Sequence, residues 1–351
     1  KTPDGTGFPP VNADPFVWVD PDTGRVFNID LYGGCSWLNY SDTKGDSWQH
    51  SPAACGNIVN DHQTITAGKP VAGLSTIGYP KILYYCFNRV VDGSCGRSLD
   101  GGLTWTPTTP GISGIHAQTR QLCSSLHGHA RTDSAGRLFI PYGHCGEPTI
   151  AFTEDAGTTW SRVRVSTVNS AGTHLSVAVD AADNLYFVWW DSQKRRPYLA
   201  VSRDHGRTWS DPMMIAPPGV AEANFPVIAA GDEGHIAVSF PSSTTGTGNR
   251  KPWDQTVIVS TNALDEQPVF LSATANDPAD PIHRGACSGR CGGLWDFLDI
   301  VVASQGELWA AASDDCVDTC VTGNGATLKA GRGIAIRQIG GPLLREPKTE
   351  D

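Results

Sequence analysis

Short runs of alternating hydrophobic and polar residues follow one another along the whole chain, and most of them come in pairs joined by a turn-forming group. One pair covers residues 174–180 and 185–188. Alternation with a period of two, interrupted by Gly, Asp, Asn or Ser, is typical of β-hairpins. Five further pairs follow the same pattern: residues 14–20 with 26–27, 62–65 with 82–85, 129–133 with 138–140, 225–229 with 236–240, and 297–302 with 307–310. The pattern therefore predicts six hairpin units.

A second repeat is the octad Ser-x-Asp-x-Gly-x-Thr-Trp, which follows the hairpin pairs. Near-complete copies cover residues 98–105, 153–160 and 202–209, and a weaker copy at 41–48 has Thr43 where Asp is expected. The four Trp residues are spaced by 57, 55 and 49 positions. In such an octad the Asp and hydroxyl side chains hydrogen-bond turn amides, Gly adopts a positive φ, and Trp packs under the hairpin. We therefore interpret the octad as a folding motif.

These octads resemble the Asp-boxes, or BNR repeats, of sialidases and related propellers. The resemblance implies an all-β fold, a six-bladed β-propeller with Asp-box hairpins, and six units in 351 residues come to roughly 58 residues each. The octad is missing from the last two units, and the long irregular stretch 241–290 leaves seven blades open. We expect a single domain over residues 1–351, with a polar N-terminal arm at 1–11 and a frayed polar tail at 343–351.

Composition agrees with many short strands joined by tight turns, because the chain contains 39 Gly, 24 Pro and 11 Trp. The formal net charge is −10 and no dense cluster of Lys or Arg occurs, which argues against nucleic acid as a partner. No apolar run approaches the roughly 18 residues that cross a bilayer, so we predict no membrane span. We expect a monomer.

The ten cysteines are even in number and fall into close sequence pairs. This arrangement favours disulfides and a secreted, extracellular protein, and the Asn39-Tyr40-Ser41 sequon is compatible with secretion. The last four cysteines, with two C-x-x-x-C spacings, leave two alternatives open: cross-links between the two pairs, or a tetrahedral zinc site. The pairs are Cys35 with Cys55, Cys86 with Cys95, Cys123 with Cys145, Cys287 with Cys291, and Cys316 with Cys320.

His and Asp gather at the start of the predicted inner strands. In a propeller the first strand of every blade lines the central axis, so polar residues just before these strands converge at one end of the channel, where ligands usually bind. The register gives Asp14, Asp61, His62, His127, His129, His174, Asn224, Asp296 and Asp299. We predict the functional site at this channel mouth. The alternative is that these side chains only hydrogen-bond the amides of neighbouring blades.

Two chemistries suit these residue types. In glycoside hydrolysis one carboxyl group acts as an acid and a second group as nucleophile or base, without any cofactor, and the candidate catalytic residues are Asp14, Asp61 and Asp296. The candidate substrate-binding residues are His62, Asn224, Arg120 and Trp190. In the second chemistry a divalent metal ion in the central channel is held by His62, His129 and His174, with Asp14 or Asp296 as the carboxylate.

Sialidases, which the octads resemble, bind the substrate carboxylate with three arginines, the first in an Arg-Ile-Pro type motif. The matching segment here is Asp14-Pro15-Phe16, and we expect no Arg at the start of any inner strand. We therefore predict a secreted, carbohydrate-active glycoside hydrolase that is not a true sialidase. The alternative is a non-catalytic propeller that binds a glycan, a protein or a metal ion. Tyr142 and His144 would place a phenol and an imidazole near the same rim, as the base and acid of a lyase require.

Overall fold

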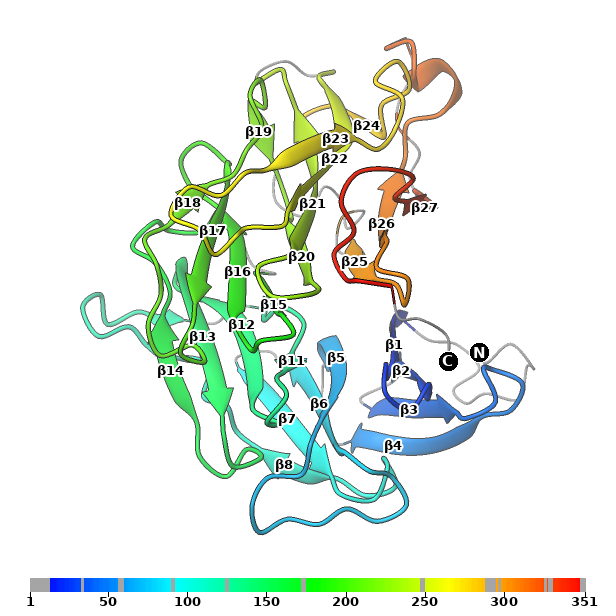
Figure 1. Ribbon diagram of the computed structural model, residues 1–351, viewed down its shortest axis with the longest axis vertical. Coiled ribbons are helices and arrows are strands. Elements are labelled where there is room, and N and C mark those ends of the chain that lie inside the picture. Colours follow the sequence, from blue (N-terminus) through cyan, green and yellow to red (C-terminus); the bar gives the residue numbers. More distant parts are fainter. Residues whose placement is uncertain are drawn as a thin grey trace. The chain divides into compact units, whose positions relative to one another are not determined.

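The computed structural model shows an all-β chain with six blades, as predicted, and almost no helix (Figure 1). The described residues are 13–32, 35–55, 60–89, 92–123, 126–171, 175–246, 250–287, 295, 298–324, 327 and 331–347. The chain divides into two compact units, and we describe each separately. Unit one comprises residues 1–145 and 149–164, and unit two comprises 146–148 and 165–351. No helix in the described part of the chain is long and apolar enough to cross a bilayer.

The first three blades are antiparallel four-stranded sheets whose strands lie in sequence order. Blade one contains β1 (Ala13–Val19), β2 (Val26–Tyr32), β3 (Cys35–Ser41) and β4 (Gln49–Cys55). Blade two contains β5 (Asp61–Gly68), β6 (Ile82–Asn88), β7 (Gly93–Ser98) and β8 (Thr106–Thr108). Blade three contains β11 (Arg131–Thr132), β12 (Leu138–His144), β13 (Glu147–Thr153) and β14 (Ser161–Arg164). The short hairpin β9 (Gly114–Ile115) and β10 (Leu122–Cys123) precedes blade three.

The remaining three blades lie in unit two. Blade four contains β15 (Ser176–Val179), β16 (Leu185–Trp190), β17 (Pro197–Ser202) and β18 (Met213–Met214). Blade five contains β19 (Glu222–Ala223), β20 (Val227–Ala230), β21 (Ile236–Ser243), β22 (Pro252–Ser260), β23 (Leu271–Thr274) and β24 (His283–Arg284). Blade six contains β25 (Asp299–Val302), β26 (Leu308–Asp314) and β27 (Arg332–Arg337), with the 3-10 turn η2 (Asp318–Cys320) between the last two.

All six predicted hairpin pairs are confirmed as the first strands of the six blades: β1–β2, β5–β6, β11–β12, β15–β16, β20–β21 and β25–β26. The alternative of seven blades is wrong. The irregular stretch 241–290 continues β21 and supplies β22, β23 and β24, all of which belong to the sheet of blade five. Long strands and two extra short ones, not a further blade, account for the length of this stretch.

In blades two to five the second strand is buried on both faces, which explains its largely apolar sequence. In β6 every residue is buried. Leu83 and Tyr85 pack in one cluster with Phe27 and Leu38 of blade one. Residues 82, 84 and 86 point the other way and pack with Leu138 and its neighbours in blade three. Unit two repeats the arrangement, since one cluster joins blades four and five and another joins blades five and six. Each core therefore lies between two sheets.

The Asp-box turn is held by its own side chains. In the copy after β7, Ser98 Oγ accepts the Gly102 amide at 2.9 Å, and Asp100 Oδ1 accepts the Thr104 amide at 2.9 Å. The next two octads repeat these bonds. Burial raises the pKa of Asp100, but hydrogen bonds from Thr104 and Ser98 outweigh burial and hold that pKa below its ordinary value. The octad is thus a folding motif, as its residue types predict.

Within unit one the Asp-box turns of blades two and three also pack on the preceding blade. A Cβ atom at Gly102 would lie 2.4 Å from Cδ2 of Leu38 in blade one, and a Cβ at Gly157 would lie 2.7 Å from Thr108 in blade two. Arg97 of blade two donates to the carbonyl of Ala156 in the next turn at 2.9 Å. Gly is required at these positions for close approach as well as for positive φ. The octad therefore joins blades together.

Four of the predicted cysteine pairs are disulfides: Cys35–Cys55, Cys86–Cys95, Cys123–Cys145 and Cys316–Cys320. The zinc alternative is wrong for Cys316 and Cys320, because their sulfur atoms are bonded to each other. Cys287 is also disulfide-bonded, and Cys291 lies outside the described residues. The Asn39 of the sequon is buried in β3 and donates to Asp30 at 2.8 Å, so its amide is engaged within the fold.

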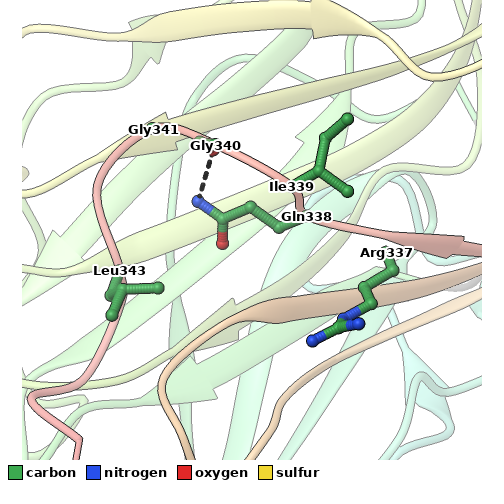
Figure 2. Close-up of a pocket in the computed structure, with 6 residues that line it drawn as sticks. All are labelled: Arg337, Gln338, Ile339, Gly340, Gly341 and Leu343. Atoms are coloured by element: carbon green, nitrogen blue, oxygen red, sulfur yellow. Dashed lines mark hydrogen bonds between the residues drawn. The ribbon is translucent and has the colours of Figure 1, made fainter.

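The sequence led us to expect a frayed tail from Leu343 onward. The described part of this C-terminal segment is instead anchored to the fold. Leu344 is fully buried in the core shared by blades five and six. Its amide donates to Gly306 at 2.9 Å, and its carbonyl accepts the amide of Asp232 at 2.7 Å. Figure 2 shows the bend before it, where the Gln338 side chain donates to Gly340 at 3.0 Å. The polar composition of this segment gave no indication that Leu344 is buried. Residues 1–11 and 348–351 lie outside the described residues.

We predict that Gly102→Ala destabilises the protein more than Gly24→Ala. Both glycines have positive φ, +101° and +73°, but only Gly102 lacks room for a Cβ, since nothing lies within 4 Å of that position at Gly24. Overpacking of this kind costs about 1–3 kcal/mol beyond the backbone strain that both variants share. Urea denaturation measures the difference in the free energy of unfolding. Equal losses in the two variants would contradict a role of the Asp-box turn in blade packing.

Leu344→Ala is expected to lower the free energy of unfolding by about 2–4 kcal/mol, because the change leaves a cavity in the core of blades five and six. The adjacent Leu343 is 38% exposed and makes a matched control. Leu343→Ala should cost less than about 1 kcal/mol. Thermal unfolding of both variants tests the anchor, and similar melting temperatures would show that the segment is only loosely attached.

Candidate functional site

The inner strands of unit one are irregular at the positions where the sequence predicts the site. The pairing of β1 with β2 shifts between Ala13 and Phe16, and the pairing of β5 with β6 shifts between Asp61 and Thr64. Asp14 and His62 lie within these bulges and have φ of +48° and +54°. Bulges redirect side chains, and strained backbone of this kind is concentrated at functional sites. The irregularity therefore marks the same place in two successive blades.

Three histidines from two blades meet beside these bulges, and we call His62, His127 and His129 the inner-strand histidine cluster. The ring centroid of His62 lies 5.8 Å from that of His129 and 6.0 Å from that of His127. Phe16 of β1 packs edge-on against His129 at 4.6 Å. The His127 amide donates to Asn88 Oδ1 at 3.0 Å, which fixes the backbone before β11. The structure thus brings together residues more than sixty positions apart in the sequence.

Two of the clustered imidazoles are neutral at physiological pH. Burial lowers the pKa of His127 to about 4, against the opposing effects of a backbone hydrogen bond to Gly128 and of the charge of Asp61. Burial also lowers the pKa of His129 to about 3, and the charge of Arg131 acts in the same direction. Nδ1 of His127 lies 2.8 Å from the Gly128 carbonyl, and the backbone of Phe87 also forms a hydrogen bond with the ring. The His127 side chain is fully buried.

Two of the three predicted catalytic residues, Asp14 and Asp61, lie at the bulges of β1 and β5. Asp61 is half-buried, and its Oδ1 accepts the amide of His62 at 2.8 Å. Asp14 is exposed, and its backbone carbonyl accepts a hydrogen bond from the side chain of Gln63, which ties β1 to β5. The third residue, Asp296, lies outside the described residues. Asp299, which opens β25, belongs to unit two.

The predicted substrate-binding and metal-binding residues have diverse surroundings. Asn224 is fully buried before β20 in unit two, and neither atom of its side-chain amide has a hydrogen-bond partner among the described residues. Trp190 is 2% exposed and packs 4.9 Å from Phe225, so it presents no ring face to a ligand. Arg120 is exposed in the turn between β9 and β10. His174 lies outside the described residues.

One functional candidate was missed at the sequence level. We expected no Arg at the start of an inner strand, but β11 begins at Arg131. Arg131 is half-buried, donates to the Ala130 carbonyl at 3.1 Å, and its charge acts on His129. The alternation His127, His129, Arg131 was the available signal, because residues two apart lie on the same face of a strand. A single cation therefore lies beside the histidines, and it does not make a triad.

Comparisons with solved structures concern the fold of the chain. A crystal structure of a protein of unknown function from Dyadobacter fermentans superimposes with a TM-score of 0.53 at 11% identity, covering 93% of this chain and 95% of that one. A leech intramolecular trans-sialidase gives 0.53 at 10% identity, and the NanB sialidase from Streptococcus pneumoniae gives 0.52 at 11% identity. Each of these two comparisons covers 87% of this chain and 65% of the sialidase chain. Such low identities establish the fold alone.

None of the curated proteins compared with this sequence matches it. A family model described as a BNR repeat-like domain matches residues 37–237, more than half of the chain and all four octads. The matched region also contains the inner-strand histidine cluster. The resemblance of the octads to Asp-boxes is therefore confirmed, and the protein belongs to the BNR repeat-like family of sialidase-like β-propellers.

Proposed function

We propose that this protein is a secreted, carbohydrate-active glycoside hydrolase that binds its substrate at the inner-strand histidine cluster. One observation supports this function above the others. Two imidazoles with strongly lowered pKa values lie at the inner strand of blade three, and the charge of Asp61 acts on one of them, His127. Buried ionisable groups with perturbed pKa values, set beside carboxylates, are characteristic of catalytic sites.

Neutral imidazoles suit a ligand rich in hydroxyl groups. A neutral imidazole has one N–H donor and one acceptor nitrogen, and the N–H donor of His127 is already directed at the Gly128 carbonyl. Asp14, His62 and His129, none of which is fully buried, supply polar groups on three successive blades. Phe16, packed against His129, adds an apolar surface of the kind that contacts the C–H face of a sugar ring.

Hydrolysis of a glycosidic bond needs two carboxyl groups. One gives its proton to the glycosidic oxygen as the C–O bond breaks, and the other attacks the anomeric carbon or removes a proton from the attacking water. Asp61 and Asp14 are the candidates for these roles, since both lie at the bulges of successive inner strands. Asp296 stays a predicted catalytic residue.

The proposal of secretion rests on the cysteines. The described residues contain four complete disulfides and no free cysteine, which is the usage typical of proteins from oxidising compartments. The sequon adds no support, because Asn39 is buried and hydrogen-bonded.

Metal binding stays a prediction. Neutral imidazoles are the form that ligates metals, and His127 and His129 have it. However, no group of three or more His, Cys, Asp or Glu among the described residues is arranged to hold a metal ion, and His174 lies outside them. No step of the proposed reaction passes through a metal.

We predict that Asp61→Asn lowers turnover at least 100-fold, because proton transfer or nucleophilic attack by a carboxyl group contributes at least that factor. A microarray of neutral and charged glycans identifies ligands, and release of reducing ends from them measures turnover. The control is Asp46→Asn, which removes the same charge from an exposed octad turn. Binding without any turnover would favour the non-catalytic alternative, and an array without any bound glycan would contradict the proposal as a whole.

The pKa values of the cluster predict a pH-dependent stability. Unfolded histidines bind protons near pH 6.5, whereas folded His127 and His129 do so only near pH 4 and 3. Acid therefore favours the unfolded state as the pH falls from about 6.5 to 4, by about 1.4 kcal/mol per pH unit for each histidine. His129→Phe, with an aromatic ring of similar size, should reduce this slope by about half. Denaturation curves between pH 7 and 4.5 measure it, and an unchanged slope would contradict the lowered pKa of His129.

A further inference from the structure

A second group of titratable side chains lies farther out on blade three, and we call His116, Tyr142, His144 and Arg162 the rim cluster. The ring centroids of His116 and His144 are 5.9 Å apart, and those of Tyr142 and His144 are 6.3 Å apart. Tyr142 and His144 lie at the end of β12, Arg162 lies in β14, and His116 directly follows β9. The function proposed above uses none of these four residues.

The rim cluster is held by an inserted hairpin. β9 and β10 form a sheet of their own between blades two and three, and the disulfide Cys123–Cys145 joins the end of β10 to the residue after His144. Nδ1 of His116 accepts the amides of residues 118 and 119 at 3.3 and 3.2 Å. A neutral ring that accepts through Nδ1 carries its proton on Nε2. The His116 imidazole is thus oriented as a donor.

Arg162 is an exposed cation without an ion-pair partner among the described carboxylates. Its Nη1 donates to the Gly111 carbonyl at 2.8 Å, and the guanidinium also forms a hydrogen bond with the Tyr142 hydroxyl. Arg162 also lies close to the Tyr142 hydroxyl. Burial raises the pKa of Tyr142 to about 12, and the charge of Arg162 only partly opposes this effect. Tyr142 therefore keeps its proton and can donate it in a hydrogen bond.

Gly114 keeps the space between the guanidinium and the imidazole open. A Cβ atom at this position would lie 3.5 Å from Nη1 of Arg162 and 4.0 Å from Cε1 of His144. Any larger side chain would fill this space. A guanidinium, a phenol and an imidazole N–H make a donor set for an oxyanion, and planar carboxylate and sulfate groups are the ligands that Arg binds best.

The rim cluster adjoins the inner-strand histidine cluster. His127 pairs with Tyr142 in an antiparallel bridge, so the start of the inner strand and the end of β12 lie side by side on blade three. A saccharide bound at the inner-strand histidine cluster would therefore extend toward Arg162 if it ran outward along this blade.

We propose that the rim cluster is a subsite for the carboxylate or sulfate group of an anionic saccharide that extends outward from the inner-strand histidine cluster. This inference rests on the proposed function, because it assumes that the histidine cluster binds a saccharide. It assigns Arg162 as the principal ligand of the anion, Tyr142 and His116 as hydrogen-bond donors, and Gly114 as the residue that leaves room for it.

The test compares three classes of oligosaccharide on one array: uronate-containing, sulfated and uncharged. We expect the wild-type protein to retain at least one charged class, and the class retained identifies the anion. Arg162→Gln should weaken the dissociation constant of that ligand at least tenfold, as measured by calorimetry. Arg207→Gln, which removes the same charge from the octad turn of blade four, should change it less than twofold. Gly114→Leu should mimic Arg162→Gln without removing a charge.

A second measurement examines the subsite alone. Inorganic sulfate should shift the imidazole signals of His116 and His144 in ¹H–¹⁵N spectra of the full chain, and Arg162→Gln should abolish the shifts. Retention of uncharged oligosaccharides only, with no effect of Arg162→Gln, would overturn the anion subsite and leave the proposed function intact. Retention of no oligosaccharide would overturn both. Asp61→Asn separates the two further, since it should stop turnover and leave anion affinity unchanged.

Discussion

The packing of the Asp-box turns of blades two and three against the preceding blade is the constraint on which unit one depends. The turn is rigid because Asp and hydroxyl side chains bind its amides, and its glycine contacts the neighbouring sheet directly. Gly102 meets Leu38, and Gly157 meets Thr108, so the distance between successive sheets is set twice by the same device. Because β6 contributes apolar side chains to both of its faces, fixing the sheets also fixes the two cores. The separation of His62 from His127 and His129 follows from this spacing.

The site depends on departures from the regular repeat. The hydrophobic pattern and the octads predicted six blades because they repeat with the period of the fold. A bulge changes the register by one residue, and no local pattern announces it. The sequence therefore placed His62 at the start of its inner strand but did not reveal the bulge there. Arg131 was missed for another reason, since it begins β11 in regular register and reads as an ordinary strand position. Disulfides between cysteines close in sequence were predictable, because a hairpin brings such residues together.

Other features arise only from tertiary contacts. Leu344 follows a polar bend, and nothing near it in the sequence distinguishes it from Leu343, yet it fills the core between blades five and six. Trp190 was a candidate substrate-binding residue, but its ring is buried against Phe225. The rim cluster unites a hairpin insertion with the ends of two strands from another sheet, so Tyr142 and His144 could be noticed in the sequence whereas His116 and Arg162 could not. Burial and distant pairing, unlike periodicity, leave no local signal.

The two clusters differ in charge, and this difference suits them to different roles in binding a saccharide. A net charge of −10 repels anionic saccharides at long range, but such repulsion is screened beyond roughly 8 Å at physiological ionic strength. Recognition of an anion must then come from short contacts, and a cation without a carboxylate partner, such as Arg162, is the residue able to supply them. The histidine cluster has the opposite character, because burial keeps His127 and His129 uncharged. Neutral imidazoles do not form ion pairs with the Asp61 carboxylate, so its charge stays available to the reacting bond. An anion held at the rim would therefore orient the saccharide and leave the electrostatics of the carboxylates unchanged.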